Sequence, residues 1–337
     1  MAAGTVLELR NEPLRLSAPF RISGYVFEAM PATVATLRRG RHAGRGEAAG
    51  VYYLDDRPEG MLATLEANRA EIERGIDREQ ARALLPPGGA RNALDCALWE
   101  LESRSAGVPV WRLAGLDGVR PLLTTFTLGA DAPEAMAAGA RGFAKARAIK
   151  LKLTGDVELD AARIGAVRAA RPDVWLGVDA NQGYVPQTLE RLLPVLVAQQ
   201  VSLLEQPCRR GHEHELDGVD RIVPIAADES VQGLDEVDAL AGRFDVVNIK
   251  LDKCGGLTEG LLMAERARAL GMKVMVGNMC GTSLAMAPAF VLGQLCDVVD
   301  LDGPLYLEHD RAPSVRYGDG MIHCSDDVWG PSPAAVA

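Results

Sequence analysis

The chain has 337 residues, of which 48% are hydrophobic and 24% are charged, and its formal net charge is −10. This length suits one large domain with a smaller one, and the acidic balance without a basic tract argues against nucleic acid as a partner. The sequence contains no run of about 18 apolar residues, so no membrane partner is expected. The six cysteines form no CxxC pair, and the first residues lack the layout of a secretory signal. Together these features predict a cytoplasmic protein.

Residues 1–118 predict a mixed α+β segment. The stretches TVLELRNEPLRL and HAGRGEAAGVYY are typical of antiparallel strands, whereas GMLATLEANRAEIERGI and ARNALDCALWELESRSAG are typical of helices. We expect this segment to pack closely on the rest of the chain, since no low-complexity linker follows it. Residues 306–337 fit no further repeat and are expected to rejoin it.

From about residue 122 the sequence alternates short apolar runs with longer helical patterns. The runs cover residues 122–129, 148–153, 174–180, 201–207, 223–230, 245–251, 273–279 and 297–304. Regular alternation of this kind predicts βα units and a parallel sheet. Eight units within residues 119–305 predict an α/β fold, a (β/α)₈-type (TIM-like) barrel with an N-terminal α+β capping domain. A doubly wound open sheet is the alternative.

Polar side chains stand at the carboxyl ends of these runs, where the active sites of such barrels lie. In AIKLKL, Lys150 and Lys152 alternate with apolar residues, so both side chains point to one face of the strand. The other polar residues at the run ends are Asp179, Asn181, Glu205, Asp228, Glu229, Lys250, Asp300 and Asp302. This pattern predicts that carboxylates and ammonium groups gather at one mouth of the barrel.

Three of these carboxylates suit a hard divalent ion. Asp179, Glu205 and Asp228 come from consecutive strands and offer only oxygen ligands, which favours one Mg²⁺ per subunit. We expect Asn181 and Glu229 to orient their neighbours.

Two lysines from opposite sides of the barrel could face a substrate at this ion from two directions. A metal beside Lys152 and Lys250 suits removal of a proton next to a carboxylate, because the ion stabilises the enediolate and the amine takes the proton. Such a lysine must be partly neutral near pH 7. The positive charges of Lys150 and the ion are expected to lower its pKa.

The motifs IKLK, VDANQG, LLEQP, AADES and NIKLDKCGG resemble the enolase superfamily, in its muconate-lactonizing subgroup. The stretch ARNALDCALWELESRSAGVPVWRLAGL is similar to the capping domain of that family, which covers the barrel and helps to select the substrate. The resemblance implies an isomerase with Lys152 and Lys250 as catalytic groups and with Lys150 supporting the enediolate.

DLDGPL is similar to the Asp-x-Asp signature of dipeptide epimerases, such as L-Ala-D/L-Glu epimerases, which implies that Asp300 and Asp302 hold the free α-ammonium of a dipeptide. GTSLAMAPA is similar to close relatives that include N-acyl-glutamate racemases. Glutamate-preferring relatives often carry a cation in the loop after APF. Here RISGYVFEAMP offers Tyr25, Phe27 and Met30 and no arginine beyond Arg21, and Met279 ends the seventh run. These apolar side chains predict a substrate other than strictly Ala-Glu.

The sequence therefore predicts a Mg²⁺-dependent epimerase that removes and returns the α-proton of a dipeptide. One alternative is racemisation of an N-acyl amino acid, which has no free ammonium group. A second is a syn-dehydratase or cycloisomerase of the same superfamily, and a third is a non-catalytic binding protein that keeps the same frame. A homo-oligomer acting on a small molecule is the expected assembly.

Overall fold

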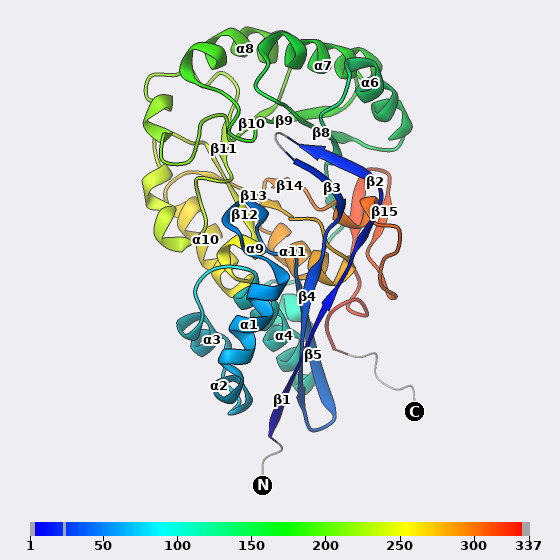
Figure 1. Ribbon diagram of the computed structural model, residues 1–337, viewed down its shortest axis with the longest axis vertical. Helices are drawn as coiled ribbons and strands as arrows, with labels where there is room; N and C mark the ends of the chain where they lie inside the picture. Colours follow the sequence, from blue (N-terminus) through cyan, green and yellow to red (C-terminus); the bar gives the residue numbers. More distant parts are fainter. Residues whose placement is uncertain (1–3, 23–24, 332–337) are drawn as a thin grey trace.

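The computed structural model describes residues 4–22 and 25–331. Within these ranges the chain forms a barrel of parallel strands, an N-terminal α+β region and a small C-terminal sheet (Figure 1). The predicted fold class, a (β/α)₈-type barrel with an N-terminal capping domain, is confirmed. The domain boundaries after residues 118 and 305 stay predictions.

Eight parallel strands follow one another in the barrel in chain order. They are β7 (Phe126–Leu128), β8 (Ala148–Lys152), β9 (Trp175–Asp179), β10 (Leu203–Glu205), β11 (Ile225–Ala227), β12 (Val246–Lys250), β13 (Lys273–Gly277) and β14 (Val298–Val299). The Thr125 amide donates to the Val299 carbonyl at 3.0 Å, which joins the first strand to the last. Every predicted run contains one of these strands. The register sets Asp179 beside both Lys152 and Glu205, so the polar strand ends meet at one edge.

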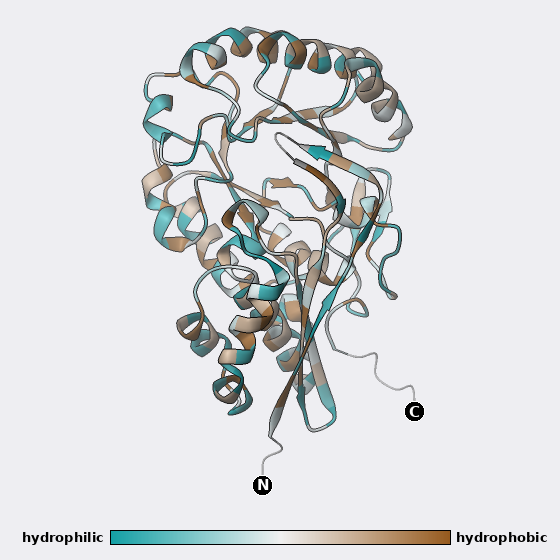
Figure 2. Cartoon of the chain, in the orientation of Figure 1, coloured by the Kyte–Doolittle hydropathy of each residue, from teal (hydrophilic) through white to brown (hydrophobic). Residues whose placement is uncertain are grey.

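Helices cover most of the outer face of the barrel. They are α6 (Pro133–Gly142), α7 (Val157–Ala170), α8 (Pro186–Ala198), α9 (Leu251–Cys254), α10 (Leu257–Ala269) and α11 (Ser283–Gly293). The α7 helix begins after Asp156, whose side chain accepts a hydrogen bond from the Leu159 amide at 3.0 Å. Hydrophilic and hydrophobic residues alternate along α7 and α8 (Figure 2), as expected for helices with one face on the strands. Among the described helices, none is both long and apolar enough to cross a bilayer.

The regular alternation of strand and helix fails at two connections. Between β10 and β11 the chain forms only the 3₁₀ turn η2 (Glu213–Leu216), and between β11 and β12 only η3 (Leu234–Glu236) and η4 (Asp238–Leu240). The first connection, CRRGHEHELDGVDR, has too few apolar residues at helical spacing to bury a helix face against the strands. Here the expected βα unit is reduced to a loop.

The N-terminal region packs an antiparallel sheet on a group of helices. The sheet contains β1 (Thr5–Glu12), β4 (Ala32–Arg39) and β5 (His42–Ala48), and a separate hairpin contains β2 (Arg15–Ile22) and β3 (Tyr25–Ala29). The helical segments are η1 (Tyr52–Leu54), α1 (Pro58–Ala67), α2 (Arg69–Glu73), α3 (Arg78–Leu84), α4 (Gly89–Ala106) and α5 (Val110–Leu113). Gly44 lets α4 lie directly on β5, because a Cβ atom there would come within 2.1 Å of the Ala97 carbonyl oxygen.

The end of the chain ties the N-terminal region to the barrel. After β14 and the turn η5 (Gly303–Tyr306), Leu307 pairs with Leu16, and Arg311 reaches Glu47 at 2.7 Å. Then β15 (Arg316–Gly318) and β16 (Met321–His323) pair with β6 (Leu122–Leu123) in an antiparallel sheet. The predicted run at residues 122–129 is therefore split between two sheets. The β2–β3 hairpin crosses in front of the barrel (Figure 1).

Candidate active site

A cavity lies at the carboxyl ends of the barrel strands, where small-molecule sites of such barrels are found. Most of the predicted site residues line it, namely Phe27, Lys150, Lys152, Asn181, Asp228, Glu229, Lys250, Met279, Asp300 and Asp302. Asp179 and Glu205 are fully buried and contact the lysines of this cavity. The side chain of Tyr25 lies outside the described residues.

Three carboxylates converge as the sequence predicts. Asp179, Glu205 and Asp228 present oxygen atoms that all lie within 4.8 Å of one another. The Asn248 side chain donates to Glu205 Oε1 at 2.9 Å, and the Asn181 backbone N–H donates to Asp179 Oδ1 at 3.0 Å. These bonds fix the orientation of the carboxylates from behind. Such a set could hold one divalent cation through oxygen ligands.

The two predicted catalytic lysines approach these carboxylates from different strands. Lys152 Nζ lies 2.6 Å from Asp179 Oδ2, and Lys250 Nζ lies 2.6 Å from Asp228 Oδ2. Their strands, β8 and β12, are separated by β9, β10 and β11 in the eight-stranded barrel. The two amines therefore enter the cavity from opposite sides of the barrel.

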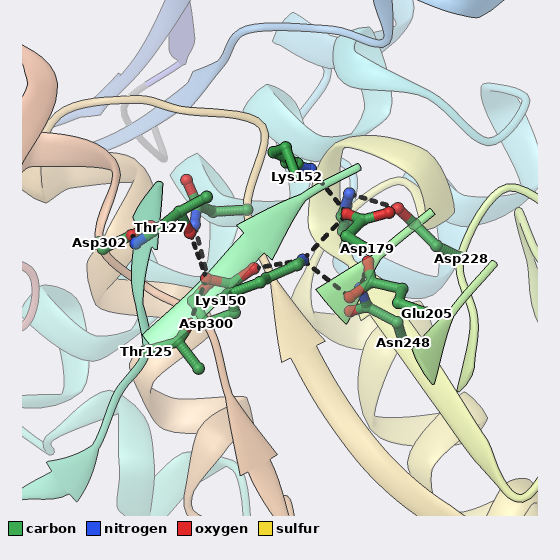
Figure 3. A network of polar contacts seen from close by, with 12 residues as sticks. Thr125, Thr127, Lys150, Lys152, Asp179, Glu205, Asp228, Asn248, Asp300 and Asp302 are labelled. Atoms are coloured by element: carbon green, nitrogen blue, oxygen red, sulfur yellow. Dashed lines mark hydrogen bonds and ion pairs between the residues drawn. The ribbon is translucent and has the colours of Figure 1, made fainter. Parts of the chain in front are cut away.

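A third lysine connects the carboxylates to the last strand. Lys150 Nζ lies 2.7 Å from Glu205 Oε2, 3.2 Å from Asp179 Oδ2 and 2.8 Å from Asp300 Oδ2 (Figure 3). The alternation in AIKLKL therefore places the Lys150 amine in this buried cluster of carboxylates. Its charge is balanced by three carboxylates, which satisfies the requirement that a buried ion be paired.

The described charged groups of this cluster leave an excess of negative charge. Six carboxylates (Asp179, Glu205, Asp228, Glu229, Asp300 and Asp302) face four ammonium groups (Lys150, Lys152, Lys250 and Lys253). Burial and the nearby Asp179 charge raise the pKa of Glu205 to about 8, and burial and the Asp228 charge raise the pKa of Glu229 to about 7. A divalent cation would offset both the crowding and the net charge of −2 that these ten groups carry when all are ionised. The donor set therefore fits a hard divalent ion.

The carboxylates also change the expected behaviour of a catalytic lysine. Burial alone would lower the pKa of Lys250, but the charges of Asp228 and Glu205 outweigh it and raise this pKa well above its ordinary value. The sequence prediction concerned a lysine beside Lys150 and a bound ion; Lys150 lowers this pKa as expected, and the effect of the ion stays a prediction. The protein groups alone crowd Lys250 with anions, and only a cation held by those anions would weaken their effect on the amine.

The two aspartates of the Asp-x-Asp pair lie in different environments. Asp300 is paired with Lys150 and accepts a hydrogen bond from Thr125 Oγ1 at 2.6 Å. Asp302 accepts hydrogen bonds from the Thr127 amide at 2.7 Å and from Tyr306 Oη at 2.8 Å, both on Oδ2. Burial, with the neighbouring Asp300 charge, raises the pKa of Asp302 to about 6. A cation at Asp302 would therefore relieve an existing repulsion.

Two polar residues at the carboxylates were missed by the sequence analysis. Asn248 stands two residues before Lys250, so the same period-two alternation could have placed it on the cavity face. Lys253 lies in α9, one turn beyond Lys250, and its Nζ is 2.6 Å from Asp228 Oδ1. Burial lowers the pKa of Lys253. In the sequence, Lys253 is the second lysine of the motif NIKLDKCGG, and this could have identified it.

Aromatic and apolar side chains form the opposite wall of the cavity. Phe20 and Phe27 pair across the hairpin, with Phe20 5.2 Å from the Tyr306 ring and Phe27 5.1 Å from the Tyr52 ring. Further apolar lining comes from Leu16, Met30, Met279 and Cys280. Apart from Phe27, Met30 and Met279, these residues could not be identified from the sequence, because they come from distant segments without a shared motif.

A parallel barrel with a buried carboxylate triad and lysines on opposite sides defines a class of enzymes that move a proton next to a carboxylate. The chain matches the family "Enolase C-terminal domain-like" over residues 130–328 and "Mandelate racemase / muconate lactonizing enzyme, N-terminal domain" over residues 44–115. The protein therefore belongs to the enolase superfamily, in its mandelate racemase and muconate lactonizing enzyme branch.

Individual relatives of known activity cover most of the chain. It is 35% identical to the L-Ala-D/L-Glu epimerase of Escherichia coli (strain K12), over 93% of this chain and 98% of that one. It is 38% identical to an N-acetyl-D-glutamate racemase of Pseudoalteromonas sp, over 73% and 78%.

Solved structures show the same architecture. An enolase family member from Agrobacterium tumefaciens, with homology to dipeptide epimerases and with bound sodium and L-Ala-L-Glu, superposes with a TM-score of 0.93 at 36% identity, covering 97% of this chain and 100% of that one. A dipeptide epimerase from Methylococcus capsulatus, in complex with Mg and L-Arg-D-Lys, gives a TM-score of 0.90 at 28% identity, covering 96% and 97%.

Proposed function

We propose that this protein is a Mg²⁺-dependent dipeptide epimerase, an isomerase that removes the α-proton of a dipeptide on one face and returns a proton on the other. The observation that carries the proposal is the placement of Lys152 and Lys250. They come from opposite sides of one barrel, line one cavity and both reach the same carboxylate triad. The epimerases and the racemase among the relatives support the same reaction class.

The proposed reaction divides the work among the residues of the cavity. Bound Mg²⁺, held by Asp179, Glu205 and Asp228, would supply charge that stabilises the enediolate form of the substrate carboxylate. One of the lysines Lys152 and Lys250 takes the α-proton, and the other, as an ammonium group, delivers a proton to the opposite face.

The proton transfer depends on neighbours that hold these groups in place. Lys150 adds a fixed positive charge beside the triad, since its buried amine is anchored by Asp300. Asn181 and Glu229 keep the triad oriented, and Asn248 does the same for Glu205.

The free ammonium of the dipeptide is assigned to Asp302, together with the nearby charge of Asp300. Asp302 holds Thr127 and Tyr306 through Oδ2, which leaves Oδ1 for the substrate cation. Asp300 is already bound to Lys150 and acts on the ammonium mainly through its charge.

The preferred substrate is a dipeptide with an apolar second residue. Among the described residues that line the cavity, the cations are Lys150, Lys152 and Lys250, and all three pair with carboxylates. None of them is free to bind a side-chain carboxylate of the substrate, whereas Leu16, Phe20 and Phe27 offer apolar surface. Burying an apolar side chain there is favourable.

A dipeptide-library screen in D₂O tests the activity and the preference together. Epimerisation exchanges the α-hydrogen with solvent, so each turned-over dipeptide gains mass, and we expect the largest gain for dipeptides with an apolar second residue. A library without any mass gain in the presence of Mg²⁺ would refute the proposal.

Racemisation of an N-acyl amino acid is the second candidate, and the relationship to the Pseudoalteromonas racemase favours it. A blocked amino group has no ammonium for Asp302 to bind. Turnover of L-Ala-L-Leu should therefore exceed that of N-acetyl-L-leucine, and the reverse order would identify a racemase.

Two further features belong to the same proposal. The six cysteines are free, which supports a cytoplasmic location. A homo-oligomer is the expected assembly, and light scattering on the purified protein measures it directly.

A further inference from the structure

Three buried side-chain oxygens at the cavity have no hydrogen-bond partner among the described protein groups. They are Tyr53 Oη, Asn181 Oδ1 and Glu229 Oε2, and all three residues line the cavity. Asn181 and Glu229 stand next to the triad, where an unused oxygen is readily explained by the metal site. Tyr53 comes from the N-terminal region, in the turn η1, and no part of the proposed reaction uses its hydroxyl.

An unpaired buried hydroxyl is costly, so buried tyrosines usually have a partner. The Tyr53 oxygen is buried, and its ring packs at 5.2 Å and 89° against the Tyr52 ring. No described protein group therefore pairs with this hydroxyl, which lies at the cavity.

The segment that carries Tyr53 is held firmly against the barrel. The Gly50 amide donates to Asp252 Oδ1 at 3.0 Å, and Asp252 lies two residues beyond Lys250. On the other side of the turn, Asp56 accepts a hydrogen bond from the Gly89 amide at 2.7 Å. Gly50 has a φ of +73°, and a Cβ atom there would come within 2.1 Å of the Asp56 carbonyl oxygen. The hydroxyl is thus fixed in place before substrate binds.

The surroundings of the hydroxyl define which group it can bind. A tyrosine phenol keeps its proton at neutral pH, so the Tyr53 hydroxyl can donate a hydrogen bond. Its charged neighbours are Asp228, Lys250 and Glu229, all on the β11 and β12 side of the barrel. Under the proposed function, the substrate group drawn to this side by Mg²⁺ and the lysines is its carboxylate.

We propose that Tyr53 is a substrate-binding residue, whose hydroxyl donates a hydrogen bond to the carboxylate of the bound dipeptide beside Lys250. This inference rests on the proposed function for the identity of the ligand. It adds a fixed contact from the capping region to a site otherwise built by the barrel. It also gives a partner to a hydroxyl that no described protein group pairs with.

The first test measures stability without any ligand. Tyr53→Phe removes a hydroxyl that has no protein partner, so the melting temperature should stay the same or rise. The matched variant is Tyr184→Phe, because Tyr184 is buried and its hydroxyl, unlike that of Tyr53, donates to a protein group, Asp160 Oδ2 at 2.6 Å. That variant should lose stability. A comparable loss in Tyr53→Phe would show that its hydroxyl has a partner inside the protein, and would overturn the inference.

The second test measures binding in a protein that cannot complete the reaction. Calorimetry with L-Ala-L-Leu and Mg²⁺ compares Lys152→Ala with Lys152→Ala/Tyr53→Phe. A lost hydrogen bond to a charged group predicts a dissociation constant about tenfold weaker in the double variant. Equal affinities would overturn the assignment of Tyr53 alone. Absence of binding in Lys152→Ala itself, with the other dipeptides of the screen also inert, would instead overturn the proposed function.

Discussion

The floor and the roof of the cavity are built by different means. The floor consists of charged side chains at the ends of neighbouring barrel strands, where the register of the sheet fixes them, as with Asp179 between Lys152 and Glu205. The roof consists of Phe20 and Phe27 on one hairpin and Tyr52 on one short turn. A change in the floor disturbs a connected network of charges, whereas a change in the roof alters only the contact surface. Under the proposed function, the floor carries out the reaction and the roof selects the substrate.

The largest effect is expected from removing either amine of the floor. Lys152→Ala and Lys250→Ala should each lower epimerisation of L-Ala-L-Leu by roughly 10³-fold, the scale of lost general acid–base catalysis. The exposed Lys145 provides the control, because Lys145→Ala changes the same residue type away from the cavity. Chiral chromatography of the products measures the rates. Near-normal turnover in either active-site variant would show that the assigned roles are wrong.

The next largest effect concerns the metal site. Glu205→Gln keeps the size of the buried side chain but removes one charge of the triad, and turnover should fall about 10²-fold with the lost metal stabilisation. Mg²⁺ should raise the melting temperature of the unchanged protein, since it binds only the folded state, and should raise it much less in this variant. Glu134→Gln, at an exposed carboxylate, should respond as the unchanged protein does. An equal Mg²⁺ response in Glu205→Gln would place the ion elsewhere.

A smaller effect is expected at the border between floor and roof. Asp302→Asn keeps the shape that accepts from Thr127 and Tyr306 but loses the charge for the substrate ammonium. Turnover of dipeptides should fall about 30-fold, mainly through a higher KM. Residual turnover of N-acetyl-L-leucine should not fall, because that molecule has no ammonium. A parallel loss for both substrates would remove Asp302 from ammonium binding.

The smallest effect is expected in the roof, as a change of preference. Phe27→Arg brings a cation to the cavity, so the ratio of turnover for L-Ala-L-Glu to that for L-Ala-L-Leu should rise about tenfold. Val26→Arg is the matched control, because Val26 is 55% exposed and its side chain alternates to the other face of the strand. If both variants shift the ratio equally, the shift comes from the added positive charge alone and not from its position in the roof.

The same division explains how much could be predicted from the sequence. The floor follows from local rules, because period-two alternation and one polar strand end per unit place Lys150, Lys152 and Asp228 together. The roof, to which Leu16 and Tyr53 also contribute, depends on tertiary packing between distant segments, so neither these two residues nor Phe20 carry a recognisable pattern. Charge balance was also beyond the sequence, since the direction of the Lys250 pKa depends on how many carboxylates face it.

The central claim is that two lysines act on opposite faces of one α-carbon, and deuterium exchange in the single-lysine variants tests it most directly. L-Ala-L-Leu and L-Ala-D-Leu are each incubated with Lys152→Ala and with Lys250→Ala in D₂O containing Mg²⁺. Each variant keeps one base, so we predict that one variant exchanges the α-hydrogen of only one diastereomer and that the other variant exchanges only its partner. Exchange of the same diastereomer by both variants, or of both diastereomers by either one, would contradict the account.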